Sequence, residues 1–198
     1  MNSEGAIMEV EILEAPVDGI IPVGTHRRLL DYHIGPEDIE LTFNHRLAHE
    51  NGWSHGYADY VVEEYKRFAY LCIHGNQVCT PSKDVDQAWH LHLTYTNDYW
   101  GRFCPKLLGK DLHHGPTIGG MEDEMKYRQH YIETLQLYES VFGRKPPSNI
   151  WKDVDTRFSH DSNAQWVDLA SNIVTSKNSL WFKITSAVLV GVLLGQFI

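Results

Sequence analysis

Apolar residues recur at every third or fourth position along much of this chain, which is the period of an amphipathic α-helix. Such stripes run through residues 36–49, 56–74, 85–103 and 121–142. Glycine, which often follows the last turn of a helix, stands soon after three of these ranges, at Gly52, Gly75 and Gly143. Residues 8–23 alternate only weakly and predict a short strand or an extended arm. The pattern therefore predicts a mostly α-helical bundle.

Residues 88–95 allow two interpretations. As a strand, they would place His90, His92 and Thr94 on one face, an arrangement used by metal sites in β-barrels. As a helix, they belong to a stripe that persists for about five turns, which is longer than most strands. We favour the helix, because residues 80–82 also supply an N-cap candidate and a proline for the first turn.

The side chains with the clearest chemistry are concentrated in residues 84–116. Four of the twelve histidines lie there, and histidine and aspartate bind first-row metals or move protons near neutral pH. Asp86 and His90 are four residues apart and share a helical face, whereas His92 projects about 160° away from His90. His114 follows in a predicted loop. We therefore predict a site for Fe, Mn or Zn formed by Asp86, His90 and His114.

Three further side chains are candidate catalytic residues that would relay protons or support the ligands, namely His92, Tyr99 and Cys104. His92 also lies in the apolar stripe beside Trp89, where a histidine hydrogen-bonded inside the core is the more common outcome. A kink or helix end near Leu91 would instead favour His92 as a ligand. Both interpretations stay open at this point.

The remaining histidines give weaker signals. His45 and His49 are four residues apart with His55 nearby, and could clamp a metal, but such a pair is more often a solvated helix face. His74 stands where it would interact with the negative end of a helix dipole. His113 is as consistent with a surface histidine as with a ligand.

The same region carries a resemblance to a known family. It rests on a central motif, on a preceding helix and on later positions: Asp84-Val85-Asp86-x-x-Trp89-His90-x-His92-Leu93, Tyr99, Phe103-Cys104, Gly109 and His114-x-Pro116; Glu64-Tyr65-x-Arg67-Phe68-x-x-Leu71; and Tyr138-x-x-x-Phe142-Gly143, Pro146-Pro147 and Ile150-Trp151. Over residues 35–151 the chain resembles the glycine-rich domain-containing protein (GRDP-like) family. The resemblance implies a mostly helical domain whose motif residues are Asp86, His90, His92 and His114. It implies no particular reaction, and roles that need a glycine-rich tail are not expected.

Composition narrows the class of protein. The chain has 198 residues, of which 42% are hydrophobic, so it can bury one sizeable core. Its formal net charge of −9 argues against binding nucleic acid, because phosphate backbones attract clustered Lys and Arg. Three cysteines without C-x-x-C spacing indicate neither a disulfide framework nor a thiolate zinc site. A reducing compartment is the simpler interpretation.

Four parts are expected along the chain. Residues 1–34 form an N-terminal extended arm without signal-peptide character, residues 35–151 the helical domain, and residues 152–179 a polar tether. Residues 180–198 are apolar enough for a C-terminal transmembrane helix that would contact membrane lipid. Lys177 and Lys183 flank its start, so the main domain would be cytoplasmic.

Two classes of function follow. In the first, the chain is a membrane-anchored metal-dependent hydrolase or oxidoreductase with the predicted ligands at its centre. In the second, the histidine and aspartate motif is a structural device, and the chain is a non-catalytic, membrane-tethered binding or scaffold module. A protein or small-molecule partner of unknown identity is expected in either case. Whether the chain is an enzyme is left open.

Overall fold

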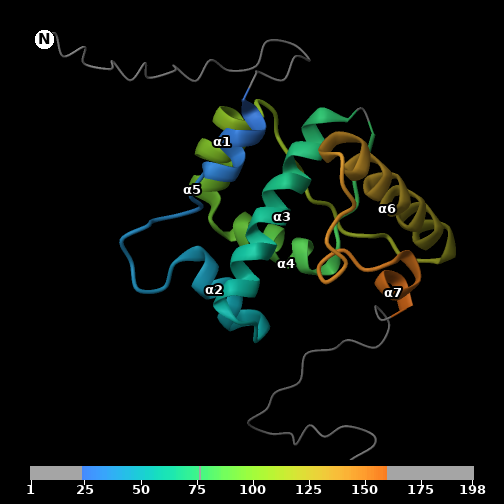
Figure 1. Ribbon diagram of the computed structural model, residues 1–198, viewed down its shortest axis with the longest axis horizontal. Coiled ribbons are helices and arrows are strands. Elements are labelled where there is room, and N and C mark those ends of the chain that lie inside the picture. Colours follow the sequence, from blue (N-terminus) through green and yellow to red (C-terminus); the bar gives the residue numbers. More distant parts are fainter. Residues whose placement is uncertain (1–23, 76, 160–198) are drawn as a thin grey trace, which may run out of the picture. The chain divides into compact units, whose positions relative to one another are not determined.

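The computed structural model describes residues 24–75 and 77–159. The elements, drawn in Figure 1, are α1 (Thr25–Asp31), α2 (Phe43–Asn51), α3 (His55–His74), α4 (Lys83–Thr94), α5 (Thr96–Asp98), the π-helix η1 (Tyr99–Leu108), α6 (Met121–Phe142) and α7 (Val154–Ser159). No strand occurs within these two ranges. The prediction of a mostly α-helical bundle is confirmed.

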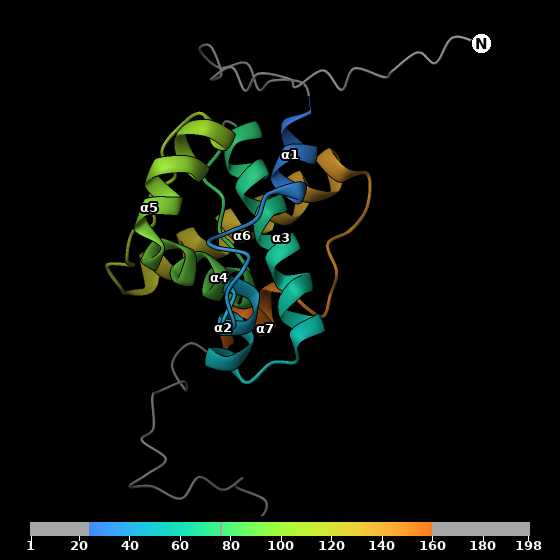
Figure 2. The same ribbon diagram turned by 90° about the vertical axis from the view of Figure 1, so that its left-hand side faces the viewer.

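Helix α3 is the element around which the others pack. It contacts α1, α2, α4, α6 and η1, and Figures 1 and 2 show it running between them. Val61, Tyr65 and Phe68 lie on one face at spacings of four and three residues, and all are fully buried. Burying each such side chain contributes roughly 1.5–3 kcal/mol. The apolar stripe read from the sequence is therefore the centre of the core.

Local side chains explain where several helices begin and end. Thr42, Ser54 and Ser82 stand at the N-caps of α2, α3 and α4, and each hydroxyl accepts a hydrogen bond from the amide three residues later. Each such cap is worth about 1 kcal/mol. Gly52 and Gly143 follow α2 and α6 with φ of 66° and 65°. That left-handed conformation favours glycine, so both helices end there.

The predicted helices over residues 56–74 and 121–142 agree with α3 and α6. The helix predicted from Pro36 begins later, at Phe43. Residues 37–41 form bends instead, and the hydroxyl cap that starts α2 is supplied by Thr42.

The long apolar stripe over residues 85–103 is not one helix. Helix α4 ends at Thr94, and Tyr95 has φ −84° and ψ 57°, outside the helical range. The chain then continues through α5 into η1, which contains Pro105. Proline has no amide N–H, so Pro105 cannot donate a hydrogen bond within this helix. The break separates the two halves of the motif and redirects the second.

Two short helices lie outside the predicted helical domain, residues 35–151. Within the predicted extended arm, residues 1–34, the chain forms α1, and Leu29 is fully buried in the core. A helix of 7 residues is too short to show a clear apolar stripe in the sequence. Such a helix is stabilised by tertiary packing, here against α3. Helix α7 lies in the predicted polar tether, residues 152–179. The strand or arm predicted at residues 8–23 lies outside the described residues.

The prediction of a membrane anchor requires correction. Residues 180–198, where we expected it, lie outside the described residues. In the part of the chain that the structure describes, no helix is both long and apolar enough to cross a bilayer. α3 and α6 have 20 and 22 residues, but both carry charged side chains along their exposed faces. A tail-anchored, single-pass membrane protein with its main domain in the cytoplasm is therefore not supported.

Replacing Trp89 with alanine tests the packing between α4 and α3. Trp89 is 5% exposed, its ring lies 5.4 Å from that of Phe68, and its indole N–H donates to Tyr99. Trp89→Ala should therefore lower the free energy of unfolding by about 3–5 kcal/mol, measured by urea denaturation. Trp100→Ala, at a side chain that is 41% exposed, serves as the control and should cost less than about 1 kcal/mol. If Trp89→Ala unfolded at the same urea concentration as the parent, the packing of Trp89 between α4 and α3 would be contradicted.

Candidate functional site

The first turns of α4 carry two of the predicted ligands. Ser82 caps this helix, and Asp84 and Asp86 lie in its first turn, where the helix dipole favours negative charge. Asp86 and His90 are one turn apart, and His90 Nε2 lies 3.7 Å from Asp86 Oδ2. The helix therefore presents a carboxylate and an imidazole side by side, as their spacing predicted.

The third predicted ligand comes from the segment between η1 and α6. His114 Nε2 lies 2.9 Å from Asp86 Oδ1, and its ring centroid is 4.4 Å from that of His90. One potential ligand atom from each of Asp86, His90 and His114 lies within 4.8 Å of the other two. The structure thus brings together the three residues that the sequence proposed as metal ligands.

An aromatic support holds the His114 segment against α4. Trp89 Nε1 donates to Tyr99 Oη at 2.8 Å, and the Tyr99 hydroxyl donates to the carbonyl of Leu112. The Trp89 ring lies 4.5 Å from the ring of His114 in an edge-to-face arrangement. Burial raises the pKa of Tyr99 well above its ordinary value. Tyr99 is therefore a neutral hydrogen-bonding support for this segment.

The three side chains of the cluster differ in their exposure to solvent. The side chains of Asp86 and His114 are 25% and 19% exposed, whereas that of His90 is 56% exposed. An Asp carboxylate with two imidazoles is a donor set that suits Fe(II), Mn(II) or Zn(II). Three protein ligands leave coordination positions open, in contrast to closed structural sites with four.

His92 lies in the core, away from this cluster. It is fully buried, with Nδ1 2.8 Å from Tyr65 Oη and Nε2 3.1 Å from Asp98 Oδ1. An ionised carboxylate only accepts hydrogen bonds, so Nε2 carries the proton and Nδ1 accepts from Tyr65. Burial lowers the pKa of His92, against the opposing effect of Asp98. This is the core role considered for His92, in which the imidazole stays neutral.

The partner of His92, Asp98, is an important residue that the sequence reasoning missed. Its carboxylate also accepts hydrogen bonds from Tyr32 Oη at 2.6 Å, from the Gly35 amide at 2.9 Å and from Arg102. Burial alone would raise the pKa of Asp98, but hydrogen bonds from these donors outweigh it and hold the pKa well below its ordinary value. Tyr32 and Gly35 are more than sixty residues away in sequence, so no local pattern identifies the network.

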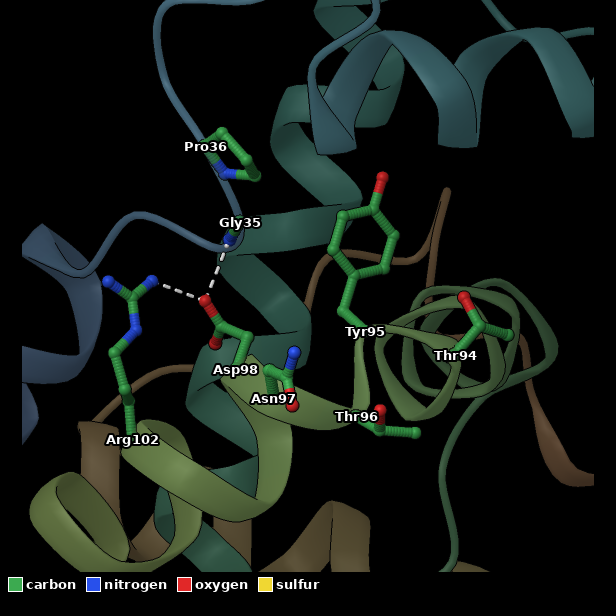
Figure 3. A pocket seen from close by; sticks show the side chains of 8 residues that line it. All are labelled: Gly35, Pro36, Thr94, Tyr95, Thr96, Asn97, Asp98 and Arg102. Carbon is green, nitrogen blue, oxygen red and sulfur yellow. Dashed lines mark hydrogen bonds and ion pairs between the residues drawn. The ribbon is translucent and has the colours of Figure 1, made fainter.

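Asp98 and Arg102 also line an open hollow of about 500 Å³, shown in Figure 3. Its other lining residues are Gly35, Pro36, Thr94, Tyr95, Thr96 and Asn97. This hollow lies at the C-terminal end of α4, about 12 Å along the helix axis from the turn that carries Asp86. It is therefore a feature separate from the three-residue cluster.

Other candidate residues do not join the cluster. Cys104 is fully buried, and burial raises the pKa of its thiol, which disfavours the reactive thiolate. His45 stacks on His55 with ring centroids 4.4 Å apart. The side chain of His113 is 76% exposed, and its ring packs on that of Trp100. Among the described residues, the one group of three or more potential metal ligands found is Asp86, His90 and His114.

The fold and the cluster define a helical domain with a surface-accessible histidine and aspartate site. The family described as UCP032817-like matches residues 38–136, half of the chain, and the chain belongs to that family. "Glycine-rich domain-containing protein 2" of Arabidopsis thaliana is 33% identical over 94 residues, which cover 42% of this chain and 11% of that protein. The predicted GRDP-like resemblance is confirmed. No solved structure matches the chain.

The Asp98 network predicts a particular dependence of stability on pH. The pKa of Asp98 is lower in the folded protein than its ordinary value of 3.8. Its stabilising effect is therefore fully present above about pH 4 and is lost as the pH falls toward the folded pKa. At neutral pH, Asp98→Asn should lower the free energy of unfolding by about 3 kcal/mol, because the donors around it lose a charged acceptor.

Urea denaturation across a pH series measures both effects. Asp98→Asn should show a flatter loss of stability below pH 4 than the parent, since its side chain does not titrate. Asp31→Asn is the matched control, because Asp31 is 62% exposed and pairs with Arg27 on the surface; it should unfold like the parent at every pH. If Asp98→Asn had the same free energy of unfolding as the parent and lost stability in acid as the parent does, the role of this carboxylate would be refuted.

Proposed function

We propose that this domain binds a divalent transition-metal ion between Asp86, His90 and His114. The observation that carries the proposal is the convergence of their three ligand atoms within 4.8 Å. Asp86 and His90 come from adjacent turns of one helix, while His114 comes from a segment held by its own hydrogen bonds. Sites arranged in this way need little reorganisation to bind an ion.

The donor chemistry supports Fe(II), Mn(II) or Zn(II) as the ion. An ionised carboxylate only accepts hydrogen bonds, so His114 Nε2 donates its proton to Asp86 Oδ1. Binding through Nε2 would require that proton to move to Nδ1 or to solvent, because a coordinating imidazole nitrogen must be unprotonated. His90 is exposed enough for water or a small molecule to reach an ion beside it. The open positions would then accept such a ligand.

A second candidate function is supported by one of the same contacts. The 2.9 Å hydrogen bond between His114 and Asp86, together with the packing of Trp89 on His114, ties the segment after η1 to α4 without any ion. In this alternative, the motif is structural and the domain is a binding module. His90 distinguishes the two functions. Its ion pair with Asp86 is long, at 3.7 Å, and its side chain is 56% exposed, so a metal site needs His90 whereas a structural motif does not.

Titration of the full chain with zinc, measured by calorimetry, tests the proposal. The parent should bind one equivalent, and His90→Ala and His114→Ala should each weaken binding by at least about 100-fold, since each removes one of three ligands. His113→Ala is the matched control, because His113 neighbours His114 and its side chain is 76% exposed. It should bind zinc like the parent. Circular dichroism of the metal-free proteins checks that the helices are retained.

The structural alternative predicts a different set of results. The metal-free His114→Ala variant would lose thermal stability, because it breaks the link to Asp86, while His90→Ala would be unaffected and no variant would change zinc binding. Equal zinc binding by the parent and His90→Ala, or no binding by the parent, would overturn the metal-site proposal.

A further inference from the structure

The hollow at the C-terminal end of α4 takes no part in the proposed metal site. Its volume of about 500 Å³ falls within the range of small-molecule sites, roughly 300–1,000 Å³. Figure 3 shows Arg102 on one side of the hollow and Tyr95 on the other, with Asn97 between them. The hollow therefore combines a cation, an aromatic ring and uncharged polar side chains.

The aromatic wall of the hollow, Tyr95, is held in place by its own contacts. The Tyr95 hydroxyl accepts a hydrogen bond from Arg46 Nε at 3.2 Å, and the ring packs edge-to-face on that of Phe43 with centroids 5.4 Å apart. A Cβ at Gly35 would lie 2.9 Å from Tyr95 Cε1, closer than Cβ atoms approach other atoms. Glycine therefore allows the backbone to press against this ring. The wall is formed before any molecule binds.

The cation of the hollow, Arg102, is positioned by the protein as well. Its Nη2 donates to the Asp98 carboxylate, and its guanidinium lies 5.6 Å from the centroid of the Tyr32 ring. The Arg102 side chain is 50% exposed, and a guanidinium carries further N–H donors beside the one given to Asp98. A side chain that is already held in one position loses less conformational entropy when it binds a ligand.

The hollow offers hydrogen-bond donors rather than a free charged acceptor. Each of the two carboxylate oxygens of Asp98 already accepts two hydrogen bonds from protein donors, which occupies the acceptor sites of an ionised carboxylate. Thr96 and Asn97 line the hollow with exposed side chains and add a hydroxyl and an amide. The ligand that complements these groups carries an oxyanion, for which a guanidinium is the best-matched donor.

The charges near the hollow favour an oxyanion with a single negative charge. Arg102 is already half of an ion pair with Asp98. Glu37 and Asp38 directly follow Pro36, which lines the hollow. A phosphate monoester carries a charge of about −1.5 to −2 near neutral pH and would be repelled more strongly by these carboxylates than a carboxylate ligand, which carries one charge.

We propose that this hollow binds a small organic carboxylate, with the carboxylate group on Arg102 and an apolar body against Tyr95 and Pro36. Such a ligand would join the loop after α1 to the junction between α4 and α5. The site lies at the opposite end of α4 from Asp86. Carboxylate binding and metal binding are therefore separate properties, and either can be absent without the other.

Benzoate is a suitable probe, because it joins a carboxylate to a flat apolar ring. The test titrates benzoate into the nitrogen-15-labelled full chain, freed of metal with a chelator, and follows the amide signals by NMR. Those of Gly35, Thr96 and Asn97 should shift saturably, with a Kd of about 1 mM, as expected for so small a ligand. Those of Asp86 and His114 should not shift.

Three related probes separate the parts of the ligand. Acetate lacks the ring that would pack on Tyr95 and should bind at least about tenfold more weakly than benzoate. Benzamide keeps the ring but has no charge, and it should also bind at least about tenfold more weakly. Phenyl phosphate should bind more weakly than benzoate because of its additional charge. Tighter binding of phenyl phosphate, or equal binding of benzamide, would overturn the assignment of a carboxylate.

Two variants and a matched control locate the site. Arg102→Gln removes the charge but keeps an amide donor for Asp98, and it should weaken benzoate binding at least about tenfold. Asn97→Trp leaves Arg102 in place and fills the hollow with an indole, so the saturable shifts should be lost. Arg27→Gln is the control, because Arg27 also pairs with an aspartate four residues away but is 81% exposed on α1. It should bind benzoate like the parent.

Circular dichroism checks that each variant keeps its helices. If Arg102→Gln fails to fold, Asn97→Trp decides the matter, since its substitution leaves the Asp98 network intact. Absence of saturable shifts in the parent, shifts centred on residues outside the hollow, or parental affinity for benzoate in either folded variant would overturn the proposal.

Discussion

A buried carboxylate on α5, the short helix that follows α4, makes the interactions on which the arrangement of this domain depends. Asp98 accepts hydrogen bonds from Tyr32 and Gly35, which follow α1, from His92 on α4, and from Arg102 on η1. A charge taken out of water is tolerated only when such donors surround it. The three parts of the chain must therefore meet at this one point, which fixes where α4 stops and where η1 begins.

The position of the candidate metal cluster follows from that junction. Because the chain turns at Tyr95, Tyr99 on η1 comes back toward α4 and meets Trp89. Tyr99 then holds the Leu112 carbonyl, and His114 lies two residues further along. An uninterrupted helix would carry Tyr99 away from the segment it now supports. The helix break is thus what brings a loop histidine to the aspartate of the motif helix.

A second buried carboxylate organises the other side of the core. Glu64 on α3 is fully buried and accepts hydrogen bonds from Tyr138 on α6, from Trp151 and from Arg67. Trp151 is 87 residues away in sequence. Each of the two carboxylates joins distant parts of the chain to the central helices, so the polar groups of the core determine which surfaces pack together. The family match over residues 38–136 includes both Glu64 and Asp98.

The sequence by itself determined the features that depend on neighbours within a few positions. Apolar spacing located α3 and α6, and Asp86 and His90 share a face because they are four residues apart. The approach of His114 to Asp86 and His90 was predicted from its place in a loop that follows the motif helix. The place of His92 in the apolar stripe favoured a core role, but its hydrogen-bond partners could not be read from the sequence. The break at Tyr95 could not be read either, because the apolar stripe continues past that position. Those features depend on hydrogen bonds to residues more than twenty positions away, such as Tyr65 and Tyr32. Contacts of that range form only when the helices pack, so the tertiary structure alone decided between the two roles that the sequence left open for His92.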